Sequence, residues 1–139
     1  MNYHFFINFN QIHLFYKKMQ KNKDVHKEYY NLSNLKDISD NNEVFFRRMI
    51  ELFIKNATSS IIEIKKSYKV VDFEKMSIIA HKIKPSIDLV CNDELKALVR
   101  SIELEAKTKS YSQKLKQNIA LFSSLLKNII NDLKKLPKT

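Results

Sequence analysis

The chain has 139 residues, of which 44% are apolar and 29% charged, a length and composition that fit one globular domain with its own core. It contains no Gly and only two Pro, which favours helices and excludes glycine-rich phosphate-binding loops, since their backbone approaches phosphate at glycine positions. The net charge of +10 would suit a polyanion, but the lysines are scattered along the whole chain and are expected to be solvated.

The first segment, residues 1–29, is rich in aromatic residues that polar residues interrupt. It is too short and too polar to cross a membrane, and it lacks the basic start and small-residue cleavage site of a signal peptide. We therefore expect an N-terminal extension or linker that need not be ordered, in a cytoplasmic protein without membrane association. Cys91, the single cysteine, suits the same reducing compartment.

Residues 30–139 are expected to form the folded domain. Apolar residues before Asp40 predict a short helix that closes one end of it. From residue 40 onward, four segments each combine a helix start signal with apolar residues at helical spacing. The start signals are Asp40–Glu43, Asp72, Asn92 followed by two acidic residues, and Ser110 or Ser112.

Each of the four segments carries one apolar stripe, so four helices have a common core to bury. Amphipathic helices joined by short connections favour an antiparallel up-down four-helix bundle, and the expected fold class is therefore all-α. The predicted core residues are Phe46, Ile50, Phe53, Ala57, Ile61, Ile64, Tyr68, Phe73, Met76, Ala80, Ile83, Ile87, Val90, Leu95, Leu98, Ile102, Ala106, Leu115, Ile119, Phe122, Leu126, Ile129, Leu133 and Leu136.

One histidine of the second helical segment does not belong to its apolar stripe. His81 lies roughly 130° from the centre of that stripe, so its side chain is predicted to face solvent. Lys84 lies one turn away on the same exposed surface. A lone surface histidine is usually an ordinary solvated residue, and the residues around His81 therefore decide its interpretation.

The run Ile79–Ser86, IAHKIKPS, resembles the A-H-x-[LI]-K-x-S signature of histidine phosphotransfer domains. Tyr30, Leu32 and Leu35 match the leading Y-x-L-x-x-L pattern of this family. Its E-x-F and M-I-E-L-F patterns are matched further on by Glu43, Phe45, Met49, Ile50, Glu51, Leu52 and Phe53. The resemblance spans residues 30–136 and implies a four-helix bundle with an exposed histidine midway along its second helix.

The resemblance further implies that His81 accepts and donates a phosphoryl group, through Nε2, and that Lys84 stabilises the charge of the group in transit. Imidazole titrates near pH ~6.5, so at cytoplasmic pH one nitrogen of a neutral ring is a nucleophile without a dedicated base. The implied partners are receiver domains of hybrid histidine kinases and response regulators, which bring Mg²⁺ and the phosphoaspartate. The chain is then a monomeric, stoichiometric phosphotransfer protein without autokinase activity, cofactor or metal of its own, and not an enzyme in the usual sense.

Pro85 departs from the commoner family pattern, which has Gly at this position. Proline lacks the amide that would bond the His81 carbonyl and brings its ring against that carbonyl, at a cost of ~3 kcal/mol in an ordinary helix interior. A kink beside His81 is therefore predicted.

Two alternatives interpret the chain differently. In the dimerisation segment of histidine kinases an acidic residue follows the histidine, in the pattern H-E-x-x-x-P, whereas here Lys82 follows His81 and the proline has a different spacing. A basic helical module that binds nucleic acid or protein without phosphotransfer is the second alternative, and a solvated basic face is favoured over it. Its lysines would be Lys107, Lys109, Lys114, Lys116, Lys127, Lys134 and Lys135.

Other polar residues have weaker functional interpretations. Glu103 and Glu105 are not expected to form a catalytic pair, because residues i and i+2 of a helix point apart, and both are predicted to lie at the surface. The four histidines lack the spacing of metal ligands and have no pair of cysteines beside them.

Overall fold

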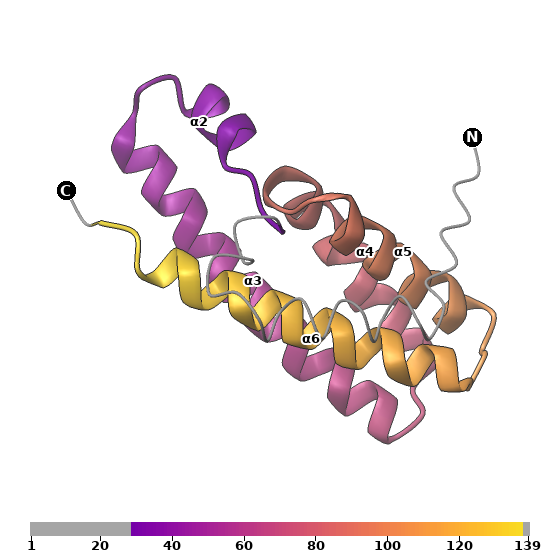
Figure 1. Cartoon of the computed structure of the whole chain (residues 1–139). Coiled ribbons are helices and arrows are strands. Elements are labelled where there is room, and N and C mark those ends of the chain that lie inside the picture. The colour runs from indigo at the N-terminus through magenta and orange to yellow at the C-terminus, as the bar shows by residue number, and fades with distance from the viewer. Residues whose placement is uncertain (1–28, 138–139) are drawn as a thin grey trace.

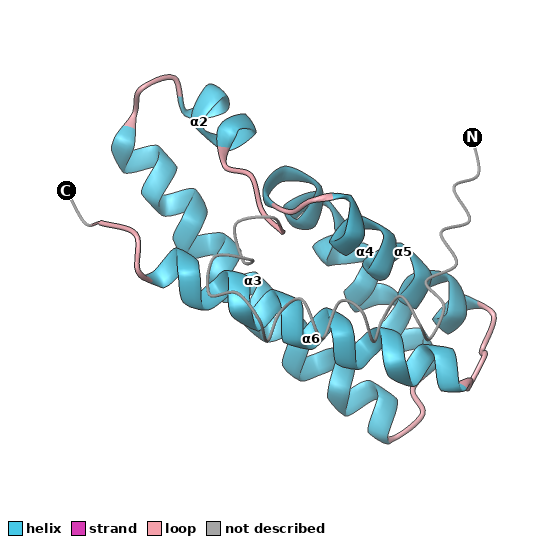
Figure 2. Ribbon diagram, viewed as in Figure 1, coloured by secondary structure: helices cyan, strands magenta, loops and turns pink. Residues whose placement is uncertain are grey.

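The structure is a computed structural model that describes residues 29–137. Over that range the chain is all-helical, as predicted, apart from loops and one isolated β-bridge (Figures 1 and 2). Residues 1–28 of the expected extension lie outside the described residues, and Tyr29, its last residue, is buried in the core. The helices are α2 (Ser33–Ser39), α3 (Glu43–Lys69), α4 (Phe73–Val90), α5 (Asp93–Lys107) and α6 (Gln113–Lys134).

The four long helices form a closed ring, which confirms the predicted bundle. Helix α3 packs on α4, α4 on α5, α5 on α6, and α6 back on α3, while the backbones of the diagonal pairs stay apart. The short helix α2 packs on α3 and α4 and lies at one end of the bundle (Figure 1). The edge formed by α4 and α5 is therefore opposite the edge formed by α3 and α6.

Every long helix begins at a side chain that accepts a hydrogen bond from a backbone amide of the first turn. The predicted starts at Asp72 and Asn92 are confirmed, and Ser112 rather than Ser110 caps the last helix. In the first segment Asn42 is the cap, whereas Asp40, where the predicted capping box opens, is the C-terminal cap of α2. Such a cap satisfies an amide that has no partner within the helix. The four bonds are Asn42 to Phe45 N (3.0 Å), Asp72 to Lys75 N (3.0 Å), Asn92 to Leu95 N (3.5 Å) and Ser112 to Leu115 N (3.0 Å).

The core contains the predicted stripes. All of their residues are buried except Phe46, Tyr68, Phe73 and Leu136, which are half-buried and pack against the core. Helix α6 buries a wider face than its single stripe predicts, with Leu121 and Leu125 inside as well. Full burial of one such aliphatic side chain stabilises the fold by roughly 1.5–3 kcal/mol. Among residues 29–137 no helix is both long and apolar enough to cross a membrane.

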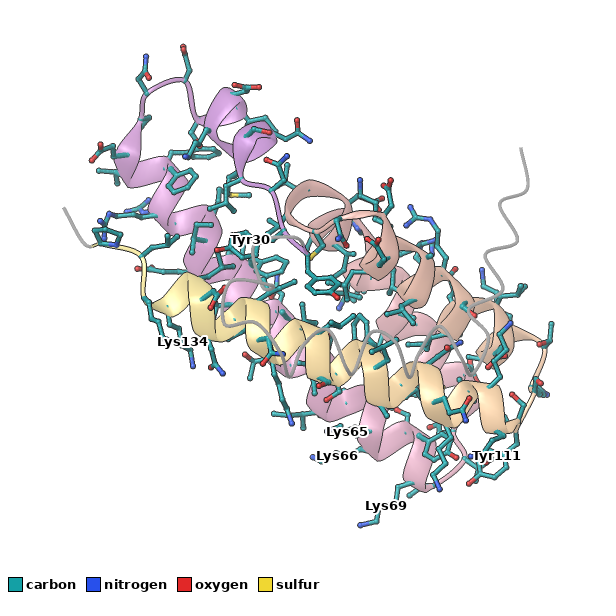
Figure 3. The ribbon with its side chains drawn as sticks, in the orientation of Figure 1. Tyr30, Lys65, Lys66, Lys69, Tyr111 and Lys134 are labelled. Carbon is teal, nitrogen blue, oxygen red and sulfur yellow. The ribbon has the colours of Figure 1, made fainter. Side chains whose placement is uncertain are left out.

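The corner between α4 and α5 consists of two residues, Cys91 and Asn92, and is tied to the segment that enters the domain. The Asn92 amide donates to the Tyr29 carbonyl (2.9 Å), and the Asn31 amide donates to the Val90 carbonyl (2.7 Å). These bonds form the isolated bridge between Tyr30, which Figure 3 labels, and Cys91. The entering segment is thereby held against the corner.

In the turn between α3 and α4 a valine occupies a backbone conformation that favours glycine. Val71 has φ of 57°, in the left-handed region where the side chain of a β-branched residue collides with its own backbone. This conformation costs roughly 1–2 kcal/mol in a non-glycine residue. A hydrogen bond across the turn, from the Asp72 amide to the Ser67 carbonyl at 2.8 Å, joins the start of α4 to the end of α3.

Candidate functional site

His81 lies midway along α4 and faces solvent, as predicted. Its side chain is 68% exposed, whereas Ala80 and Ile83 beside it are buried in the core. Helix α4 continues through Pro85 to Val90 as one α-helix. Because proline has no amide hydrogen, the His81 carbonyl lacks its usual helical partner at that position. Ile78 and Pro85, one turn before and after His81, are both exposed, so apolar groups flank the imidazole along the helix.

A buried carboxylate from the neighbouring helix lies against the His81 ring. Glu103 Oε1 of α5 is 3.1 Å from His81 Nδ1, and the Glu103 side chain is only 6% exposed. The prediction that Glu103 is a surface residue is therefore wrong. Glu105, predicted to be exposed too, is 12% exposed and faces Lys114 at 3.9 Å. The two carboxylates do point apart, but each turns toward a neighbouring helix instead of toward solvent.

Two lysines converge on the same carboxylate. Lys84 Nζ lies 2.8 Å from Glu103 Oε2, and Lys107 Nζ donates to Oε1 at 2.8 Å. Lys84, predicted to be the cation beside His81, is thus part of the site, although its ammonium pairs with Glu103. Lys107, predicted to belong to a solvated basic face, is 58% exposed and also donates to this carboxylate. We name these four residues, His81, Lys84, Glu103 and Lys107, the imidazole–carboxylate cluster.

The charges around Glu103 keep it ionised. Burial raises the pKa of Glu103, but the cations around the carboxylate outweigh this effect and lower the pKa to about 2. At neutral pH the group is a carboxylate, which can only accept hydrogen bonds. Its contact with a neutral His81 ring is therefore a hydrogen bond when Nδ1 carries the ring proton. In that tautomer Nε2 has a free lone pair.

A second ion pair joins α4 to α5 on the same side of the bundle. Arg100 donates two hydrogen bonds to the Asp88 carboxylate, at 2.9 and 2.8 Å. The hydrogen bonds from Arg100 lower the pKa of Asp88. Bidentate pairs of this kind fix orientation as well as distance. The Asp88–Arg100 pair therefore holds the two helices that carry the imidazole–carboxylate cluster.

The lysines of the second alternative do not form one free surface. Lys107 and Lys114 are turned toward Glu103 and Glu105. Lys65, Lys66 and Lys69 project from the C-terminal half of α3, and Lys134 lies at the end of α6 (Figure 3). Burial and the nearby Lys127 ammonium lower the pKa of Lys65.

Within residues 29–137 no three His, Cys, Asp or Glu side chains are grouped so that they could hold a metal ion. The site that the fold does assemble is one exposed imidazole with a carboxylate and two ammonium groups. Comparison of the chain with protein-family models, with curated proteins and with solved structures found no match.

Proposed function

We propose that the protein is a histidine phosphotransfer protein, in which His81 accepts a phosphoryl group from a receiver-domain aspartate and passes it to another receiver. The observation that carries this proposal is the exposed imidazole whose Nδ1 contacts Glu103. With the ring proton on Nδ1, Nε2 is the free nucleophile. The protein acts stoichiometrically in this scheme and has no autokinase activity. The alternative role of a basic nucleic-acid-binding module has less support, because Lys107 and Lys114 are paired with carboxylates.

The transfer step requires no general base from this chain, because Nε2 carries no proton that must be removed. The Nε2 lone pair forms a bond to phosphorus, the bond from phosphorus to the aspartate oxygen breaks, and the aspartate leaves as a carboxylate. The ring proton stays on Nδ1, and the positive charge that develops on the ring lies beside the Glu103 carboxylate. Phosphoryl transfer asks mainly for in-line positioning and charge neutralisation. The receiver would supply Mg²⁺ and the phosphoaspartate.

Lys84 is assigned the role of stabilising the charge on the phosphoryl group. Its ammonium lies on the same surface as His81, one turn along α4, and is held by Glu103 at 2.8 Å. A pre-positioned cation costs little reorganisation when charge arrives, and this is the main reason such groups stabilise transition states. The exposed side chains of Ile78 and Pro85 would contribute the apolar part of a modest, transient docking surface.

The decisive experiment incubates the full chain with phosphorylated receiver domains and follows transfer of the label. Wild type and the control His26→Gln are expected to acquire an acid-labile, alkali-stable label, and His81→Gln is expected to acquire none. Circular dichroism should show equal folding, because the His81 side chain is largely exposed. Equal labelling of His81→Gln and wild type would refute the proposal. Tight DNA or RNA binding at physiological salt would favour the alternative instead.

A second experiment tests the role of Lys84 with a neighbouring lysine as the control. Lys84→Ala is expected to slow transfer by about 10-fold, because it removes a cation that stabilises developing charge. Lys82 is exposed and is the next residue after His81, and Lys82→Ala should transfer at the wild-type rate. If Lys84→Ala and Lys82→Ala transfer at the same rate, Lys84 has no part in the mechanism.

A further inference from the structure

We propose that Glu103 is a positioning residue, which holds His81 in the tautomer with Nδ1 protonated and Nε2 free, and that Lys84 and Lys107 keep its carboxylate in place. This inference rests on the proposed phosphotransfer function and adds to it a residue that does not touch the phosphoryl group. It concerns the orientation and the proton of the nucleophile, whereas the function itself concerns whether His81 is phosphorylated.

The contacts of the Glu103 carboxylate fix its orientation. Oε1 contacts His81 Nδ1 and the Lys107 ammonium, at 3.1 and 2.8 Å. Oε2 is buried and accepts no hydrogen bond of regular geometry from the described residues, so the Lys84 ammonium at 2.8 Å is the charge that compensates it. A buried carboxylate without compensation is costly, and rotation of the group would break at least one of these contacts.

The two lysines hold Glu103 from opposite directions along the helices. Lys84 lies one turn beyond His81 on α4, and Lys107 lies one turn beyond Glu103 on α5. Because α4 and α5 run antiparallel through a two-residue corner, these two steps lead in opposite directions. The carboxylate is therefore held between the two ammonium groups along the helix axes, and His81 Nδ1 contacts its Oε1.

A fixed tautomer matters because the two ring nitrogens are not equivalent. The ring nitrogen that donates to a carboxylate must carry the proton, so the other nitrogen keeps its lone pair, as with the carboxylates that orient catalytic or metal-bound histidines. Without an acceptor at Nδ1, the exposed ring of His81 would exchange between tautomers and turn about its side-chain bonds. Only part of the molecules would then present a free Nε2 to the receiver.

The test measures the tautomer directly on the ¹⁵N-labelled full chain, by correlation spectra of the His81 ring nitrogens at a pH where the ring is neutral. Wild type should show a protonated Nδ1 and an unprotonated Nε2. Glu103→Met removes both acceptor oxygens at similar side-chain length and should show a mixed or reversed pattern. Glu105→Met alters the carboxylate two residues away, which faces Lys114 instead, and should keep the wild-type pattern.

The transfer rate supplies the second readout. Glu103→Met should slow labelling by roughly 10–100-fold, the usual effect of removing a group that orients a reactive histidine, while the label stays on His81. Glu103→Gln keeps one acceptor oxygen without its charge and should fall between wild type and Glu103→Met; it also carries the comparison if Glu103→Met does not fold. Wild-type nitrogen spectra and rates in both variants would overturn the inference. Failure of wild type to accept label would instead overturn the phosphotransfer function and leave the tautomer measurable.

Discussion

Acidification is expected to remove a sizeable part of the stability of this bundle through one group, Glu103. Its pKa in the folded protein is about 2, against an ordinary value of 4.5. Each pKa unit corresponds to about 1.4 kcal/mol, so ionised Glu103 stabilises the fold by about 3 kcal/mol. This is a large share of the roughly 5–15 kcal/mol by which domains of this size are stable.

The direction of the effect follows from which state binds the proton first. Glu103 in the unfolded chain takes up its proton near pH 4.5, whereas in the folded chain it resists protonation down to about pH 2. Its contribution is therefore complete above about pH 4.5 and is lost as the pH falls toward 2.

Urea unfolding of wild type and Glu103→Gln between pH 7 and pH 2.5 measures this contribution. Other carboxyl groups with shifted pKa values, such as Asp88 and Glu105, are present in both proteins, so the difference between the two free energies isolates Glu103. Wild type should be the more stable protein at pH 7, and the difference between the two free energies of unfolding should decrease steadily below pH 4.5. If this difference in free energy stays constant down to pH 2.5, the charge of Glu103 does not stabilise the imidazole–carboxylate cluster.

Three further predictions concern the scaffold. Val71→Gly should raise the free energy of unfolding by about 1 kcal/mol, because glycine tolerates the left-handed turn and the Val71 side chain is 47% exposed; unchanged urea denaturation would contradict the strain. Burial raises the pKa of Cys91 to about 12, so iodoacetamide at pH 8 should modify it only in urea, and rapid native labelling would be inconsistent with that burial. Asp72→Ala should lower the free energy of unfolding by about 1 kcal/mol through the lost cap, measured in the same way.

The elements that were predictable from the sequence depend on short-range interactions. Asp72 and Asn92 cap helices by bonding amides three residues further along, so the residue type and its place before an apolar stripe are enough to locate these starts. The exposure of His81 follows in the same way from the angle between it and the stripe of its own helix.

Glu103 was not predictable by the same reasoning, because its environment depends on which helix lies beside it. The spacing of Glu103 and Glu105 along α5 correctly predicts that their side chains point apart. It cannot show that Glu103 faces His81 and Glu105 faces Lys114. One signal was present: Glu103 follows the buried Val99 by four residues, at the margin of the apolar stripe, and precedes Lys107 by four. A charged residue at the margin of a buried stripe can face a neighbouring helix, and its partners come from there.

The shortness of the corner between α4 and α5 limits how this protein can change in length. One residue inserted between Cys91 and Asn92 would advance α5 by about 1.5 Å and turn it by roughly 100° relative to its present facing. Such a change would carry Glu103 away from His81 even if every side chain of the cluster were retained. Insertions are better tolerated in the longer connection between α5 and α6, where no member of the cluster lies downstream. The length of the α4–α5 corner is thus part of what places Glu103 beside His81.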